Sequence, residues 1–193
     1  MREITREITQ EEINAKLEAH KLWWDSDMKH GEQAIFKNVL ISKKSFFYQN
    51  LCNVIFEDCN IVNTVYRFAN LKDAQFKNTT LSGIDFANSN LIYTDFSTAK
   101  IENILITNTI PRGVIGQRVI CTQVNTSRRN NLIAYWADLG IWTTGCFQGT
   151  LEKLRKAIAK THKNNPFLRA RYERVINYIL EEDKADKERE KEK

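Results

Sequence analysis

The sequence is poor in the residues that mark several classes of protein. Its 193 residues include 7 glycines and 2 prolines, far fewer than collagen-like or low-complexity chains contain. No apolar run approaches the roughly 18 residues that a membrane-spanning helix needs. Residues 1–6 lack the apolar stretch of a signal peptide. We therefore expect a folded cytoplasmic protein with no membrane partner.

Cysteine and histidine are also scarce. The 4 cysteines form no CxxC pair, so reduced thiols are expected rather than a disulfide framework or a zinc site. With only 3 histidines, few positions can supply a catalytic imidazole. The sequence has no P-loop, GxSxG, HExxH or GxGxxG motif. These absences predict a protein that is not an enzyme and has no catalytic residues, metal or cofactor.

The net charge of +5 belongs to one segment of the chain. Residues 111–182 carry 12 Lys and Arg against 5 Asp and Glu, whereas residues 31–110 carry 7 of each. Residues 1–30 carry 5 against 7, and residues 183–193 carry 5 against 5. An anionic partner is therefore expected to bind residues 111–182 rather than the preceding part.

The central part of the chain has a period of five. Every fifth residue from Phe36 to Ile106 is apolar, without a break. A period of five fits neither a helix nor a flat strand, so the chain must turn regularly and place one large side chain inward per turn. Aromatic and aliphatic residues alternate along this series from Phe36 to Ile101. The predicted core includes Phe36, Phe46, Phe56, Tyr66, Phe76, Phe86, Phe96, Leu51, Leu71, Leu81 and Leu91.

Small residues occupy most positions two before these, as in Phe68-Ala69-Asn70-Leu71. This pattern resembles the pentapeptide-repeat family, whose consensus is A-(D/N)-L-x-x. The resemblance implies a mainly β fold, a right-handed quadrilateral β-helix with four repeats to a coil. Asp58, Asp73, Asp85 and Asp95 then fit solvated turn positions better than catalytic ones. We assign this solenoid to residues 31–110.

A helix over residues 10–26 is expected to cap the N-terminal end of the solenoid, giving a capping region at 1–30. Thr9 and Glu12 fit a capping box, and Ile13, Leu17 and Trp24 recur on one helical face. A solenoid end needs such a cover because it exposes its core and unpaired backbone. For His20 a packing or surface role is favoured over ligand binding.

Residues 111–182 are expected to form a small α+β module. Strands at 117–124 and 132–137 predict a hairpin, and a third strand follows at 141–144. Helices are expected to begin after the caps Thr150 and Asn165. The remaining segment, 183–193, is a charged tail that we expect to carry no core.

The run from Gly145 to Glu152 and the run from Thr161 to Asn165 resemble the C-terminal module of pentapeptide-repeat proteins encoded by phages and prophages. The resemblance identifies an origin more clearly than an activity. The first functional hypothesis is a non-catalytic phage-type interaction protein that blocks or sequesters a host protein, such as a defence component, because the sequence offers a complete scaffold without a catalytic set. If the protein is phage-encoded, it is expected to act in the host cell cytoplasm.

A second hypothesis is a sponge for a nucleotide or another small anionic ligand. The turn before Thr150 would present free backbone amides to an anion, while an ordinary strand-to-helix turn with solvated charges is the simpler interpretation. Cys146 with His162 suggests a thiolate site, and the simpler interpretation is a buried cysteine and a helix-end cation. The candidate ligand-binding residues are Arg128, Arg129, Gly149, Thr150, Lys153, Lys156 and His162.

Two further hypotheses concern nucleic acid and oligomers. Tyr135, Trp136 and Trp142 would serve as stacking platforms for nucleic acid if they are exposed. Some pentapeptide-repeat proteins imitate DNA and occupy topoisomerases, which requires a strongly acidic solenoid. The neutral solenoid here does not favour DNA mimicry or DNA binding. The apolar segment from Trp136 to Trp142 favours a homo-oligomer.

Overall fold

The computed structural model describes residues 6–126 and 131–192. The chain divides into two units, Met1–Gly116 and Gln117–Lys193. The boundary falls six residues later than the expected 110/111, because the backbone ladder of the solenoid continues to Ile115, which pairs with Asp95. The N-terminal helix belongs to the same unit as the solenoid.

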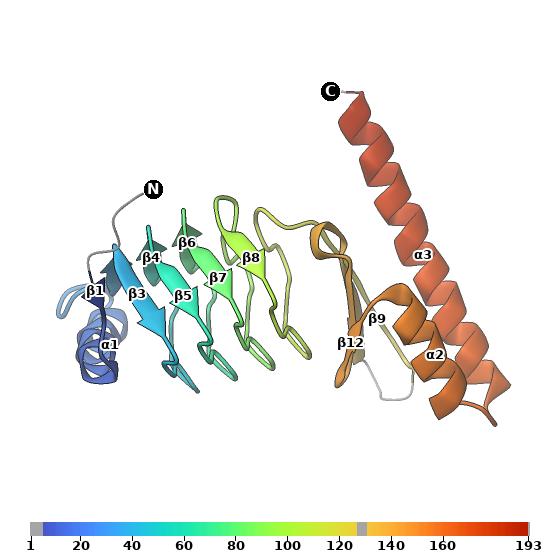
Figure 1. The fold of residues 1–193 in the computed structure, drawn as a ribbon, viewed down its shortest axis with the longest axis horizontal. Helices are drawn as coiled ribbons and strands as arrows, with labels where there is room; N and C mark the ends of the chain where they lie inside the picture. The colour runs from blue at the N-terminus through green and yellow to red at the C-terminus, as the bar shows by residue number, and fades with distance from the viewer. Residues whose placement is uncertain (1–5, 127–130, 193) are drawn as a thin grey trace. The chain divides into compact units, whose positions relative to one another are not determined.

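The first unit is a β-solenoid whose short parallel strands pair at an offset of twenty residues, as Figure 1 shows for the successive arrows β3, β5 and β7. Two faces form sheets, and the other two are joined by bridges such as Ser45 to Val65 and Asn50 to Asn70. The four ladders confirm the predicted quadrilateral fold. The strands are β1 (Arg6–Glu7), β2 (Ile35–Lys37), β3 (Val39–Ser42), β4 (Ile55–Glu57), β5 (Asn60–Val62), β6 (Gln75–Lys77), β7 (Thr80–Ser82) and β8 (Lys100–Glu102).

Aromatic rings fill the core in two stacked columns. Ring centroids are 5.1 Å apart from Phe36 to Phe56 and 4.8 Å apart from Phe56 to Phe76. The opposite column stacks Phe46 on Tyr66 at 4.7 Å, and rings of the two columns meet edge to face. Both arrangements are favoured by the ring quadrupole. The predicted core positions are buried, with exposed fractions of at most 2%.

The turns between faces use left-handed backbone at regular positions. Asp58 and Asp73 have φ of 54° and 58°, a conformation that Asn and Asp tolerate better than most residues. The carboxylates of Asp85 and Asp95 instead accept hydrogen bonds from the backbone two residues on, at 2.9 and 2.8 Å. All four aspartates therefore shape turns, as the sequence predicts.

Helix α1 (Gln10–Asp25) begins with the predicted capping box. The amide of Glu12 donates to the Thr9 hydroxyl at 3.2 Å, and the Thr9 amide donates to the Glu12 carboxylate at 2.9 Å. Ile13, Leu17 and His20 form its buried stripe. The expectation for Trp24 is wrong, since its side chain is 36% exposed. Trp24 lies in the last turn of the helix, beyond the end of that stripe.

Two polar side chains of α1 bond to the backbone of the first coil. The Gln10 amide group donates to the Ser45 carbonyl at 3.0 Å and accepts from the Ser45 amide at 2.9 Å. His20 Nδ1 accepts from the Ala34 amide at 3.2 Å, which leaves Nε2 to donate to the Cys52 carbonyl at 3.0 Å. Burial lowers the pKa of His20, so the neutral ring that makes both bonds is favoured. This confirms the packing role over ligand binding.

The second unit is a four-stranded antiparallel sheet in the order β12-β11-β10-β9, with helices on one face. Strands β9 and β10 form the predicted hairpin, and β11 is the predicted third strand. Residues Phe147–Gly149 form a fourth strand rather than a loop, because they pair back onto Trp142–Thr144. The elements are β9 (Val119–Val124), β10 (Asn131–Trp136), a 3-10 turn (Ala137–Leu139), β11 (Ile141–Thr144), β12 (Phe147–Gly149), α2 (Leu151–Thr161) and α3 (Pro166–Lys191).

Both helices begin at their predicted caps. The Thr150 hydroxyl accepts from the Lys153 amide, and the Asn165 side chain accepts from the Leu168 amide at 3.0 Å. The helices pack against the sheet, and the core between them consists of Ile133, Trp142, Leu154, Ile158, Tyr172, Val175, Ile176 and Ile179. Trp136 and Trp142 are 1% and 2% exposed. Trp142 belongs to this core and is not an exposed stacking platform for nucleic acid. The expected homo-oligomer stays a prediction.

Residues 183–191 of the expected tail belong to α3, which ends at Lys191. Asp183 is buried and forms an ion pair with Arg118 at 3.2 Å. The same guanidinium reaches Glu190 at 3.2 Å. The C-terminal part of α3 is therefore attached to the start of β9 by charge pairs.

Candidate binding site

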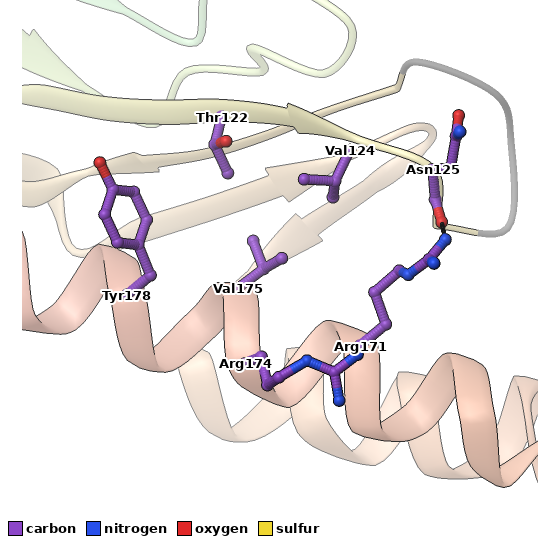
Figure 2. A pocket seen from close by; sticks show the side chains of 7 residues that line it. All are labelled: Thr122, Val124, Asn125, Arg171, Arg174, Val175 and Tyr178. Carbon is purple, nitrogen blue, oxygen red and sulfur yellow. Dashed lines mark hydrogen bonds between the residues drawn. The ribbon is translucent and has the colours of Figure 1, made fainter.

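An open groove of about 510 Å³ lies between β9 and α3 in the second unit (Figure 2). Val124 and Val175 give it apolar walls, and its polar groups come mainly from α3. The lining residues are Thr122, Val124, Asn125, Arg171, Arg174, Val175 and Tyr178, none of them acidic. The groove therefore combines apolar contact with positive charge.

The alternation of β9 and the periodicity of α3 bring these residues together. Thr122 and Val124 lie on the sheet face that the helices cover, since side chains two apart in a strand share a face. On α3, Arg171, Arg174 and Tyr178 form a stripe beside the buried core stripe, at the spacing of three and four residues. Figure 2 shows Val175 and Tyr178 directed from α3 toward β9.

Arg171 is held at one end of the groove. Its guanidinium donates a hydrogen bond to the Asn125 carbonyl and lies over the Phe167 ring, 4.6 Å from the ring centroid. These contacts use part of its hydrogen-bonding capacity and fix the direction of the side chain. Arg171 therefore supplies positive charge at a defined position beside the end of β9.

Arg174 and Tyr178 are more accessible. Tyr178 is 50% exposed, and Arg174 is exposed. Among the described residues no carboxylate forms an ion pair with Arg174. A guanidinium offers five donors in a fixed planar arrangement suited to carboxylates and phosphates. The groove is therefore able to bind an anionic group beside an apolar one.

The structure describes five of the seven ligand residues expected from the sequence. Arg128 and Arg129 lie outside the described residues, although they follow Asn125 closely in the chain. Lys156 is paired with Glu152 at 2.6 Å, which places a carboxylate in the first turn of α2. This pairing opposes anion binding at the start of that helix.

Gly149 and Thr150 have structural roles. Gly149 pairs with Trp142 in the sheet, and a Cβ at this glycine would lie 3.3 Å from Lys153 Cβ. The glycine therefore permits close packing of β12 and α2. Thr150 uses its hydroxyl to cap α2.

Cys146 lies in a turn of the sheet, whereas His162 lies at the end of α2. Cys146 is exposed in the turn between β11 and β12, so the expectation of a buried cysteine is wrong. The turn is separated from the start of α2 by a strand, which removes the predicted effect of the helix dipole on the thiol. His162 stacks on Tyr172 with ring centroids 5.4 Å apart and lines a separate hollow of about 140 Å³.

The other three cysteines differ in exposure, and Cys121 is exposed. All four are free, and Cys52 and Cys59 are buried. Burial raises the pKa of both thiols, which favours the unreactive protonated form. Among residues 6–126 and 131–192 no group of three or more His, Cys, Asp or Glu is placed to hold a metal ion.

The solenoid carries a different exposed surface. Phe47, Tyr48 and Phe68 cluster on its first coils, with Tyr48 stacked on Phe68 at 4.9 Å. Lys37 and Glu57 lie opposite each other on adjacent coils and form an ion pair at 2.7 Å. Residues 31–110 carry equal numbers of acidic and basic residues, and this charge balance does not favour imitation of DNA.

Sequence reasoning missed Arg171, Arg174 and Tyr178 as one site. The available signal was their spacing on the last helix, next to the apolar stripe at Tyr172, Val175 and Ile176. The spacing indicates a common helix face but not which strand lies beside it. That information comes only from the sheet order, in which β9 is the last strand.

The architecture of the first unit defines a β-solenoid built from five-residue repeats, with a capping helix. Residues 69–108 match the family of pentapeptide repeats in 8 copies. The solenoid is therefore a pentapeptide-repeat fold, and the matched residues lie wholly within it. No curated protein matches the chain. In the described part of the chain, no helix is both long and apolar enough to cross a membrane.

Several solved structures of pentapeptide repeat proteins are similar to this chain. One is from the thylakoid lumen of Arabidopsis thaliana, with 25% identity over 39% of this chain and 60% of its own, and a TM-score of 0.34. Another, from the cyanobacterium Cyanothece 51142, has 18% identity over 46% and 67%, and a TM-score of 0.23. QnrB1, a plasmid-mediated fluoroquinolone resistance protein, has 20% identity over 42% and 61%, and a TM-score of 0.19. This chain spans less than two thirds of the Arabidopsis protein.

Proposed function

We propose that this chain is a non-catalytic binding protein that blocks or sequesters a host factor through its C-terminal unit. The observation that carries this proposal is the groove between β9 and α3, where Arg171 and Arg174 lie beside Val124 and Val175. Its open shape and apolar walls favour part of a macromolecule as the partner. The phage-type origin suggested by the sequence makes that partner a host protein.

The solenoid acts in this proposal as a rigid support. Its ring columns and backbone ladders fix each coil on the next, which leaves little freedom for an induced active site. Its equal numbers of acidic and basic residues over 31–110 do not favour a topoisomerase partner. We expect no inhibition of gyrase supercoiling and no relief of its inhibition by quinolones.

A second candidate function is capture of a nucleotide or another phosphorylated small ligand. The half-exposed ring of Tyr178 lies in the same groove as two guanidiniums, and an aromatic ring with arginines can stack a base and bind phosphate. In this candidate function the anion binds in the groove instead of at the start of α2. The class of ligand is the same as in the sequence hypothesis.

The two functions are separated by titrating the full chain with three probes by calorimetry. The probes are a twenty-residue polyglutamate, ATP and a short DNA duplex. The proposal expects polyglutamate to bind most tightly, and binding to weaken as salt rises because exposed charges are screened over about 10 Å at 0.1 M. Tight binding of ATP alone would favour the sponge, and tight binding of the duplex alone would favour a nucleic-acid partner.

Arg174→Ala is the test variant, and Arg169→Ala is its matched control. Both residues are exposed arginines of α3, but Arg169 lines a different hollow, beside Arg155 and Glu173. The first substitution should weaken polyglutamate binding about tenfold, the loss of one charge-assisted hydrogen bond. Equal affinities of the two variants would place the anion site elsewhere.

A further inference from the structure

The four-stranded sheet of the second unit ends at β9. Strand β9 pairs with β10 over its whole length, from Val119 with Trp136 to Val124 with Asn131. Within the part of the chain that the structure describes, no strand pairs with its other side. An edge strand presents a row of backbone donors and acceptors that another extended segment can use.

Helix α3 places a row of side chains beside this edge. Tyr172, Ile176 and Ile179 are buried over the sheet, so the adjacent stripe of Arg171, Arg174 and Tyr178 faces the groove along β9. The groove therefore follows the direction of an edge strand and has side chains to one side of it. This arrangement matches a strand-shaped occupant better than a compact one.

The chemistry of the groove restricts the side chains of such an occupant. Val124 and Val175 form apolar walls, and Arg171 and Arg174 provide the charges. An added strand directs every second side chain toward the helix-covered face. Carboxylates and small apolar groups at these positions would meet the arginines and the valines, respectively.

We propose that an extended acidic segment of a partner protein adds to the sheet as a fifth strand along β9. This inference rests on the proposed function, because it names the part of the macromolecule that the groove receives. Backbone hydrogen bonds to β9 supply affinity, while the arginines and valines select the sequence. A nucleotide would use the arginines but not the backbone of β9.

The probe is the acetylated and amidated heptapeptide Glu-Thr-Val-Thr-Glu-Thr-Val, which places glutamate and valine on one face of a strand. A second peptide keeps every side chain but carries N-methyl groups on the alternate amides that would face β9; both registers of methylation are made. A third replaces both glutamates with lysine. Each is titrated by calorimetry into the full chain.

The proposal expects the parent peptide to bind and one methylated register to bind at least about tenfold more weakly, since it loses backbone hydrogen bonds. The lysine peptide should not bind. Arg174→Ala should weaken the parent peptide about tenfold, and Arg169→Ala should not. Bound peptide should slow amide hydrogen exchange in β9 and leave exchange in β4 and β6 unchanged.

Failure of this inference differs from failure of the proposed function. Equal binding of the parent and both methylated peptides overturns strand addition and leaves an anionic partner in place. Binding of ATP or DNA with no binding of the peptide also overturns it, in favour of the other partner classes. If polyglutamate, ATP, DNA and the peptide all fail to bind, the proposed function and the fifth strand are both wrong.

Discussion

In the solenoid, each buried ring meets the ring twenty residues away, as Phe56 meets Phe76 at 4.8 Å. In the C-terminal unit, the core residue Ile133 of β10 shares its cluster with Trp142 of β11, Leu154 of α2 and Ile176 of α3. The first arrangement repeats one contact, and the second assembles different contacts from several segments. The two units therefore leave different kinds of surface.

A repeated contact leaves little space, because each coil covers the previous one completely. An assembly of unlike segments leaves space where one element ends before its neighbour does. The sheet stops at β9 while α3 continues along it, and the groove of about 510 Å³ lies at that margin. Substitutions in the solenoid and in the C-terminal unit should therefore have different effects.

The largest effect is expected from a charge within the ring columns. Phe76→Asp should lower the free energy of unfolding by more than about 4 kcal/mol, since it removes a buried ring and introduces an unpaired carboxylate. Lys77→Asp, at an exposed position opposite Glu57, should cost at most about 1 kcal/mol. Circular dichroism melts that show equal losses would contradict the register of the solenoid.

An intermediate effect is expected at the charge pairs that attach the end of α3. Arg118→Met leaves Asp183 buried with Lys187 as its remaining ion partner. The C-terminal unit should lose about 2 kcal/mol, less than for a fully buried pair because Lys187 still neutralises the carboxylate. Urea unfolding followed by tryptophan fluorescence measures the loss. Lys184→Met, an exposed change on the same helix, is the control and should have no effect.

A smaller change in the free energy of unfolding, this time an increase, is expected from a substitution at Tyr66. Its hydroxyl is buried without a hydrogen-bond partner among the described residues, between Phe46 and Phe86 in the column. Tyr66→Phe should therefore raise the free energy of unfolding by about 1 kcal/mol. The exposed Tyr93→Phe should leave it unchanged. Destabilisation by Tyr66→Phe would mean that the hydroxyl has a partner.

The capping helix should make solenoid stability depend on pH. Burial lowers the pKa of His20 from its ordinary value of 6.5, so below that pH the unfolded chain binds more protons than the folded one. Stability should fall as pH drops below about 6.5, by at most about 1.4 kcal/mol per pH unit. Denaturant titrations from pH 7.5 to 5 should show this slope in the native protein and in His30→Gln. A slope that persists in His20→Gln would assign it to another group.

The solenoid was predictable because its signal repeats. Phe56, Phe76 and Phe96 recur at a fixed spacing, and every repeat therefore indicates the same coil. The capping box at Thr9 and the helix caps at Thr150 and Asn165 were equally local. Trp24 was misplaced because helical periodicity alone does not show where a buried stripe ends.

The groove was not predictable because it depends on contacts between distant segments. Cationic candidates near the start of α2 were chosen for their closeness in sequence, whereas Lys156 pairs with Glu152 on its own helix. Arg171 and Arg174 become a site only because α3 lies along β9, about fifty residues earlier in the chain. The strand Phe147–Gly149 was missed because glycines precede it at Gly145 and end it at Gly149, and glycine favours turns.

The most direct test compares the groove with the start of α2 as the anion site. Polyglutamate is titrated calorimetrically into the native chain, Arg171→Ala/Arg174→Ala and Lys153→Ala/Lys156→Ala, each checked for a native melting transition. Both double variants remove two positive charges from the same unit. We predict that the first loses affinity by about 10- to 100-fold through lost charge-assisted bonds and that the second changes less than about threefold, the long-range part of a screened charge. The reverse order, or equal losses in both, would contradict binding in the groove.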